Sequence, residues 1–265
     1  NPTDVAVGDF NEDGNLDVVT CSQSNNNFSL LLGDGTGNLA APINFTAGDL
    51  PQGIAVGDMN KDGNLDVLVT NRGTPDDVYI YFGDGAGNFA IPTILAIANV
   101  WDITVADLNG DTNLDFAVYV SNTVQVWFGN GTGIAYSLGP TITSFGLSTN
   151  PVYSADLDGD GDIDILASSG YTLNDGSGNF GARIILSQTG SEYTVADINK
   201  DTHPDIIAND NNQNTPNTRI LLGDGTGTFT LLAKFETRGY ANGLEVADVN
   251  NDNNLDVVGI GSWGG

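Results

Sequence analysis

One acidic nonapeptide occurs six times in this chain of 265 residues, at a nearly constant spacing. Every copy has Asp at positions one, five and nine, and has Asn or Asp at position three. The copies begin at Asp9, Asp58, Asp107, Asp156, Asp197 and Asp248, so the intervals are 49, 49, 49, 41 and 51 residues. A period near fifty residues indicates one supersecondary unit that is repeated along a line or around an axis. The spacing therefore predicts a single repeat domain over residues 1–265.

Each period is composed of short runs that are typical of β-strands. In the second period, one β-rich run lies at residues 54–57, just before the acidic loop, and a second at 65–70 begins in the last residues of that loop. Further β-rich runs lie at 78–82 and within 89–96. Gly, Asn and Asp separate these β-branched and aromatic runs, whereas no stretch has the 3.6-residue apolar period of a helix. Four strands in about fifty residues are typical of one blade of a β-propeller.

The predicted fold class is therefore all-β, a β-propeller of four-stranded antiparallel blades with five complete repeats and a half-blade. This gives about six blades; the family resemblance described below implies about seven if the chain is part of a longer one. The repeats are expected at approximately residues 1–50, 51–99, 100–149, 150–190, 191–240 and 241–265, of which the last is partial.

Two further patterns repeat with the same period. A Gly-rich string, such as Gly83-Asp84-Gly85 in the second repeat, supplies the positive φ angles of a tight hairpin, which we place between the third and fourth strands. The residue before each acidic loop is small, for example Gly8 and Gly57, which we attribute to crowding of the innermost first strands around an axis. We expect Leu or Ile at position eight of the loop to fill the core of its own blade.

Oxygen-bearing side chains on alternate residues of a tight loop are the ligands that a hard cation such as calcium requires. We therefore predict up to six Ca²⁺ ions, each bound by the side chains at positions one, three, five and nine and by the backbone carbonyl at position seven. The predicted ligands are Asp9, Asn11, Asp13, Asn15, Asp17, Asp58, Asn60, Asp62, Asn64, Asp66, Asp107, Asn109, Asp111, Asn113, Asp115, Asp156, Asp158, Asp160, Asp162, Asp164, Asp197, Asn199, Asp201, His203, Asp205, Asp248, Asn250, Asp252, Asn254 and Asp256. A fully coordinated ion has no open position for chemistry, so we expect a structural role.

The six loops are expected to differ in calcium affinity. Position six is Gly in three loops, where a sharp turn favours Gly, but it is Thr112, Thr202 or Asn253 in the others. Since a β-branched residue resists positive φ, the loops that begin at Asp107 and Asp197 should bind more weakly, unless the turn does not require positive φ. The loop that begins at Asp156 has the most carboxylates and should bind most tightly.

The charge of the chain follows from these loops and excludes several partners. The net charge is −27, and positions one, three, five and nine hold 19 of the 34 acidic residues, so six bound calcium ions would leave −15. Only seven Lys and Arg residues are present and they do not cluster, which argues against nucleic acid or an anionic membrane surface as a partner. No apolar run approaches the ~18 residues of a membrane-spanning helix, so membrane insertion is not expected.

Catalytic residues are not evident in the sequence. Cys21 is the only cysteine, which rules out an intrachain disulfide and predicts a buried strand residue. His203 is the only histidine and lies within an acidic loop, where we expect an outward side chain rather than a base. No nucleophile can be paired with a histidine elsewhere, so we predict that the protein is not an enzyme.

The acidic loops resemble, position by position, the calcium motif of the FG-GAP/VCBS repeat family, and Phe82-Gly83 and Phe128-Gly129 match its Phe-Gly signature. The resemblance covers essentially the whole chain. It implies calcium-bearing propeller blades like those of integrin α-subunits and bacterial surface proteins, with adhesion or ligand recognition at the cell exterior. Weak calcium loops are saturated at extracellular calcium levels, which also favours a secreted or cell-surface location.

By analogy with that family, a protein or glycan ligand would bind at the face opposite the acidic loops. The candidate ligand-face residues are Arg72, Trp101, Asp102, Tyr171, Glu192, Arg219, Tyr240 and Asn242, together with the Asn-rich loop 209–217. Non-catalytic adhesion, ligand recognition or surface assembly is the first hypothesis. The alternatives are a carbohydrate-binding lectin, an accessory domain of a secreted polysaccharide-degrading enzyme, and a structural subunit of an extracellular filament or layer that self-associates by strand exchange at its incomplete last blade.

Overall fold

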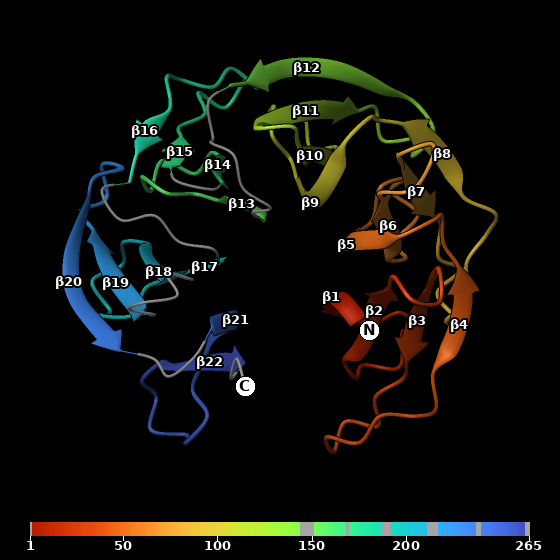
Figure 1. Ribbon diagram of the computed structural model, residues 1–265, viewed down its shortest axis with the longest axis horizontal. Helices are drawn as coiled ribbons and strands as arrows, with labels where there is room; N and C mark the ends of the chain where they lie inside the picture. The colour runs from red at the N-terminus through yellow and green to blue at the C-terminus, as the bar shows by residue number, and fades with distance from the viewer. Residues whose placement is uncertain are drawn as a thin grey trace. The chain divides into compact units, whose positions relative to one another are not determined.

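The computed structural model describes residues 2–143, 151–167, 170–186, 192–210, 217–236 and 240–262, and within them it contains β-strands and no helix (Figure 1). The chain forms two compact units, Asn1–Ile142 and Thr143–Gly265, which are described separately below. In the described part of the chain, there is accordingly no apolar helix of membrane-spanning length.

Unit 1 contains three sheets, each formed by four consecutive strands that pair in antiparallel fashion. The first sheet comprises β1 (Pro2–Gly8), β2 (Asp17–Ser22), β3 (Asn27–Leu31) and β4 (Ile43–Thr46). The second comprises β5 (Pro51–Gly57), β6 (Asp66–Asn71), β7 (Asp77–Tyr81) and β8 (Thr93–Ala96). The third comprises β9 (Val100–Ala106), β10 (Asp115–Val120), β11 (Thr123–Gly129) and β12 (Tyr136–Ile142).

Unit 2 contains two four-stranded sheets and one two-stranded sheet within its described residues. The four-stranded sheets comprise β13 (Val152–Ala155), β14 (Asp164–Ala167), β15 (Gly170–Thr172) and β16 (Ile184–Ile185), and β17 (Glu192–Ala196), β18 (Asp205–Asp210), β19 (Asn217–Gly223) and β20 (Phe229–Glu236). The two-stranded sheet pairs β21 (Tyr240–Ala247) with β22 (Asp256–Ser262). The all-β class and the four-stranded antiparallel, blade-like sheets are thus confirmed, while the number of blades stays a prediction.

The hydrophobic cores of unit 1 lie between consecutive sheets. Successive side chains of a strand point to opposite faces, so the fully buried strand β6 serves two cores at once. Val67 and Val69 pack in one core with Phe28 and Leu30 of the first sheet, and Leu68 packs in a second core with residues of the third sheet. The central strands therefore read as near-continuous apolar runs.

The contact between consecutive sheets adds a second partner for the leucine at position eight of the acidic loop. A Cβ atom at Gly8 would lie 2.4 Å from Cδ1 of Leu65, and a Cβ at Gly57 would lie 2.7 Å from Cδ1 of Leu114. Leu65 and Leu114, at position eight of the second and third loops, thus pack against the small residue of the preceding repeat as well as against the core that their own sheet forms with that repeat. At Gly8 and Gly57, the neighbouring leucine leaves no room for a side chain.

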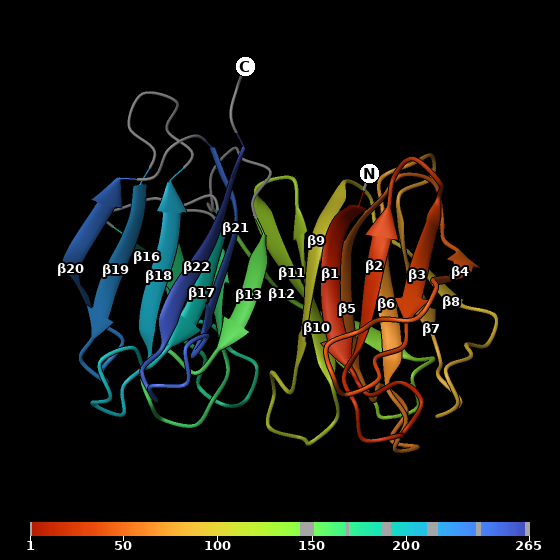
Figure 2. The ribbon, with the colours of Figure 1, turned by 90° about the horizontal axis from the view of Figure 1, so that it is seen from below.

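In each four-stranded antiparallel sheet, the acidic loop and the Gly-rich hairpin lie at the same end of the strands. The acidic loop joins the first strand to the second, and the hairpin joins the third strand to the fourth, as predicted. Because consecutive antiparallel strands reverse direction, both connections lie at one end of the strands and the remaining connections lie at the other (Figure 2). This arrangement brings each acidic loop next to the hairpin of its own repeat.

Candidate metal centres

The acidic loops share a backbone conformation with two left-handed residues, at positions four and six. At position six, φ is 85° for Gly14, 69° for Thr112, 75° for Thr202 and 66° for Asn253. Position six therefore has positive φ whatever residue is present. This excludes the alternative that the turn does not require positive φ there. Position four is left-handed as well, with φ of 62° at Lys61, a requirement that sequence reasoning missed because position four has no constant residue type.

The turn directs the side-chain oxygens of each loop toward its centre. In the first loop, the carboxylate of Asp9 accepts hydrogen bonds from the backbone amides of Asp13 (3.1 Å) and Gly14 (2.8 Å). Asp13 in turn accepts from the amide of Asn15 at 2.8 Å, and this bond, with a second from Asn11, holds the pKa of Asp13 below its usual range. The same pattern recurs in the second, fifth and sixth loops.

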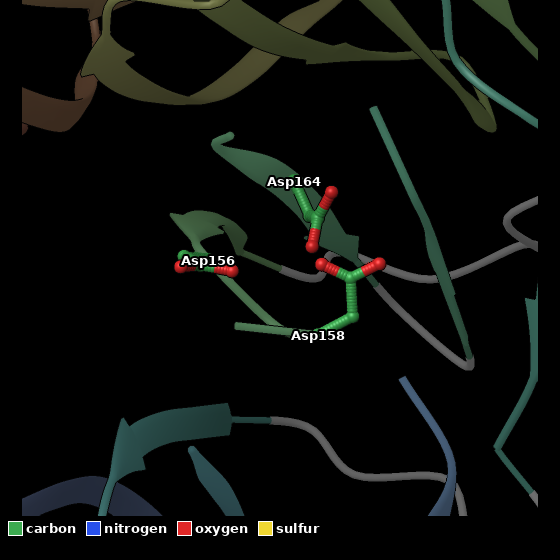
Figure 3. A group of neighbouring side chains, drawn as sticks. All are labelled: Asp156, Asp158 and Asp164. Atoms are coloured by element: carbon green, nitrogen blue, oxygen red, sulfur yellow. The ribbon is translucent and has the colours of Figure 1, made fainter. Parts of the chain in front are cut away.

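The fourth loop gathers the densest carboxylate cluster among the described residues. Ligand oxygens of Asp156, Asp158 and Asp164 all lie within 4.8 Å of one another. Figure 3 shows the carboxylate of Asp158, from the loop, facing that of Asp164, from strand β14. Burial raises the pKa of Asp164 to about 7, and burial followed by the charge of Asp160 raises the pKa of Asp158. A set of converging carboxylate oxygens fits a hard divalent cation, which would offset their repulsion.

In the other loops, position three is Asn, so the same arrangement offers an amide oxygen in place of one carboxylate. Burial also raises the pKa at position nine of the second and third loops, to about 6 for both Asp66 and Asp115. The donor sets of all six loops consist of oxygens and suit calcium by their chemistry. The assignment of individual ligands stays a prediction.

Position nine has a second role, because its carboxylate joins the acidic loop to the hairpin. The carboxylate of Asp66 is buried and accepts from the amides of Met59 and Gly83, both at 2.9 Å. Equivalent pairs of bonds reach Asp17, Asp115, Asp164 and Asp205. A Cβ at Gly83 would lie 2.2 Å from the carbonyl oxygen of Leu65, so the first hairpin glycine permits this close approach. The recurring Gly was the available signal in the sequence.

Position seven also contacts the hairpin, through its side chain. A Cβ at the second hairpin glycine would lie 2.2 to 2.4 Å from the side chain at position seven in each of five repeats. These pairs are Gly35 with Asn15, Gly85 with Asn64, Gly131 with Asn113, Gly176 with Asp162 and Gly225 with His203. The imidazole of His203 therefore lies against Gly225, which corrects the expected outward orientation.

The predicted ligand-face residues differ in exposure, and two of them come together. Arg72, which follows β6, places its guanidinium carbon 3.1 Å from the ring centroid of Trp101 in β9, so these two come together from neighbouring sheets. Asp102 in β9 and Glu192 in β17 are partly exposed. The prediction is wrong for Tyr171, which is buried and whose hydroxyl donates to the carbonyl oxygen of Gly227.

Arg219 is buried in β19 as well. The side chains of Tyr240 and Asn242, and residues 211–216 of the Asn-rich loop, lie outside the described residues. Among the predicted ligand-face residues, the structure brings Arg72 and Trp101 together, and the role of these residues in ligand binding stays a prediction.

Comparison with known proteins gives both a family and a fold. The family model described as FG-GAP-like repeat matches residues 9–69, 58–118, 113–167 and 197–259. A search of curated proteins found no match. Among solved structures, the chain is similar to a lectin from Agrocybe aegerita that recognises non-reducing terminal N-acetylglucosamine, with 19% identity and a TM-score of 0.63 over 96% of this chain and 73% of that chain.

Two further solved structures are similar at low identity. The V. cholerae biofilm matrix protein Bap1 has 18% identity and a TM-score of 0.50, with 89% of this chain and 39% of that chain covered. The exotype rhamnogalacturonan lyase YesX has 14% identity and a TM-score of 0.57, with 100% of this chain and 54% of that chain covered. The chain thus spans about half or less of the length of these two proteins, and the similarity concerns the fold alone.

Proposed function

This chain belongs to the FG-GAP-like repeat family, and from that premise we propose that it is a calcium-stabilised β-propeller domain that binds a ligand at the cell exterior without catalysing a reaction. One observation carries the proposal. The same turn, with oxygen side chains directed inward, is built six times and is bonded to a hairpin through a buried carboxylate in five of the repeats.

Calcium would stabilise the fold because it binds these loops only when they are formed. At free calcium ten times Kd, each site adds about 1.4 kcal/mol to the free energy of unfolding, so six independent sites would add roughly 8 kcal/mol. The test is thermal melting with calcium and with excess chelator, together with a calorimetric count of bound ions. An unchanged melting temperature and no heat of binding would refute the calcium proposal.

The fourth loop should contribute more of this stabilisation than the fifth. The fourth loop has four carboxylates at positions one, three, five and nine, and its turn has Gly161 at position six. The fifth has three carboxylates and the strained Thr202. Asp160→Ala should therefore reduce the calcium-induced rise in melting temperature more than Asp201→Ala does. Equal reductions would remove the ranking.

Carbohydrate is the ligand class that the contact between Arg72 and Trp101 favours. The Trp101 ring, with the guanidinium of Arg72 over it, offers an apolar surface and hydrogen-bond donors for a sugar. The similar Agrocybe aegerita lectin recognises a terminal sugar, which is consistent with this proposal.

A glycan array tests the carbohydrate proposal. Trp101→Ala should abolish any binding seen with the wild type, and Phe235→Ala is the matched control because this phenylalanine is 54% exposed on β20 of the other unit. Loss of binding in both variants, or binding that survives Trp101→Ala, would contradict the assignment. No glycan bound by the wild type would leave a protein ligand as the proposed partner.

The absence of catalysis is part of the same proposal. Cys21 is buried, and burial raises the pKa of its thiol to about 12, so it is no nucleophile at neutral pH. The ring of His203 packs against a hairpin backbone. Secretion or surface display is tested by fractionation and by protease accessibility on intact source cells.

A further inference from the structure

The side chain at position four of one acidic loop extends to the loop of the next repeat. In unit 1, Nζ of Lys61 donates a hydrogen bond to Oγ1 of Thr112, at position six of the third loop, over 3.0 Å. In unit 2, Nζ of Lys200 donates to Oδ1 of Asn254, at position seven of the sixth loop, also over 3.0 Å. The carboxyl carbon of Glu12 would lie 3.2 Å from a Cβ at Gly85, in the hairpin beside the second loop.

The backbone explains why these side chains reach a neighbour. Position four is left-handed, with φ of 55° at Glu12, 62° at Lys61 and 64° at Lys200, so the side chain leaves its own turn. The first strands of consecutive sheets lie side by side, as β5 and β9 do in unit 1, and bring successive loops into reach. Two repeats thus show a contact with the following acidic loop, and in a third Glu12 lies beside the hairpin that packs on that loop.

The two lysines place a positive charge close to metal-binding carboxylates. Lys61 contacts the hydroxyl of Thr112, and the backbone amide of the same Thr112 donates a hydrogen bond to Oδ2 of Asp107 at 2.7 Å. The amide of Asn254 likewise donates to Oδ1 of Asp252 at 2.7 Å. Lys61 thus contacts the residue between the predicted ligands Asp111 and Asn113, and Lys200 contacts Asn254, whose backbone carbonyl is itself a predicted ligand. Glu12 brings a negative charge to the corresponding place near the second loop.

We propose that the residue at position four sets the calcium affinity of the following loop, so that Lys61 weakens the third site and Lys200 the sixth, whereas Glu12 strengthens the second. This inference rests on the proposed binding of calcium. The fourth and fifth loops follow repeats with Gly110 and Gly159 at position four, and receive no charge from them. The charge at position four thus adds to the differences in affinity that carboxylate number and the residue at position six already produce.

A nearby ammonium acts in opposite directions on the empty and the occupied loop. It repels a divalent cation, but without the cation it offsets the repulsion among the carboxylates. Lys61→Met should therefore raise the calcium affinity of the third site by roughly five- to tenfold, which is the effect of one charge on a divalent ion at about 7 Å in water. The same substitution should lower the melting temperature in chelator. A purely structural contact would not give this pair of opposite changes.

The experiment is a competitive calcium titration of the full chain, with melting in chelator on the same samples. The gain in affinity from Lys61→Met should vanish when the third loop also carries Asp111→Asn, and should persist when Asp62→Asn disables the loop to which Lys61 itself belongs. Glu12→Gln should lower the affinity of the second loop by a similar factor and so gives a change of opposite sign. Lys234→Met, which removes the same charge from β20, is the control for net charge.

Two results would overturn the inference while the proposed function stands. In the first, the wild type binds calcium, but Lys61→Met leaves the affinity unchanged or changes it no more than the control Lys234→Met does. The other is a gain that survives Asp111→Asn. If the wild type binds no calcium at all, both this inference and the calcium proposal fail.

Discussion

Thr202 has a φ of 75°, a conformation that β-branched residues rarely adopt. Thr112 is also left-handed, with φ of 69°, but its hydroxyl accepts a hydrogen bond from Lys61. A substitution at Thr202 therefore tests backbone strain without removing a side-chain hydrogen bond of this kind. Replacing Thr202 with Gly should raise the free energy of unfolding by about 1 kcal/mol, because relief of a strain of 1–3 kcal/mol exceeds the entropic cost of Gly. Chemical denaturation in chelator measures this change.

The reverse substitution provides the control. Gly63 occupies the same position with φ of 93°, and nothing lies within 4 Å of a Cβ built there. Gly63→Thr should therefore cost about 1 kcal/mol through backbone conformation alone. A Thr202→Gly variant that is no more stable than the wild type would show that the loop relaxes around Thr.

Asp4 supplies a pH dependence that is independent of the acidic loops. Its carboxylate accepts from the amides of Val5 and Ile54, both at 2.8 Å, and burial raises its pKa to about 6. The titratable neighbour Cys21 stays a neutral thiol in this range. Since the folded state binds the proton more tightly than the unfolded state, ionisation of Asp4 destabilises the fold. The loss is absent below a pH of about 4 and complete above a pH of about 6.

The Asp4→Asn variant should lack this loss. Between pH of about 4 and 7, the wild type should lose about 2–3 kcal/mol relative to the variant, whatever constant difference the substitution itself introduces. Urea denaturation of both proteins across this range gives the slope. Parallel pH profiles for the two proteins would contradict the role assigned to Asp4.

Residue-level features were unequally predictable from the sequence. Positions one, three, five and nine carry oxygen-bearing side chains in every copy; the first three lie in the turn, and position nine begins the following strand, as Asp17 and Asp66 do. Position four varies from Glu12 to Gly110, so its left-handed backbone left no trace in composition. Tyr171 was misplaced because a strand aromatic can face a core or a loop edge, and only the neighbouring repeat decides which.

At the scale of elements, the joint between consecutive sheets depends on position eight of the acidic loop. Leu65 packs against the core of the first and second sheets and against Gly8, whereas the equivalent Leu16 is 69% exposed. Leu65→Ala should therefore lower the free energy of unfolding by about 2–3 kcal/mol, since a methylene-rich contact is replaced by a void.

Leu16→Ala is the matched control and should change stability by less than about 0.5 kcal/mol, as exposed substitutions generally do. Urea denaturation compares the two. Similar losses for both variants would mean that Leu16 is also covered in solution.

The strands themselves were predictable, because β-branched runs between Gly and Asn define them. The joints between repeats were not, because the partner of Leu65 lies 57 residues earlier and no local pattern marks it. The buried bonds of Asp66 to Met59 and Gly83 were missed for a similar reason, since one carboxylate joins two loops. In the sequence alone, metal binding is a sufficient reason for the constant Asp at position nine.

At the scale of the whole molecule, the net charge of −27 opposes folding when calcium is removed. In chelator, raising sodium chloride from about 0.02 to 0.5 M should raise the melting temperature, because the screening length falls well below 10 Å. At saturating calcium the same change should have a smaller effect, since bound ions have already reduced the charge. An equal response in both conditions would show that the loops do not hold the ions.

The joint between consecutive repeats has a consequence for how such chains gain repeats in evolution. In this joint, the leucine of one repeat packs against the small residue of the repeat before it. The second repeat carries both halves of this joint, because its Leu65 packs against Gly8 of the first repeat and its Gly57 receives Leu114 of the third. An in-frame duplication of about fifty residues would thus insert a unit that already fits both of its neighbours. A cut made elsewhere in the period would leave one half of a joint without its counterpart, which favours the gain and loss of whole repeats over the remodelling of single ones.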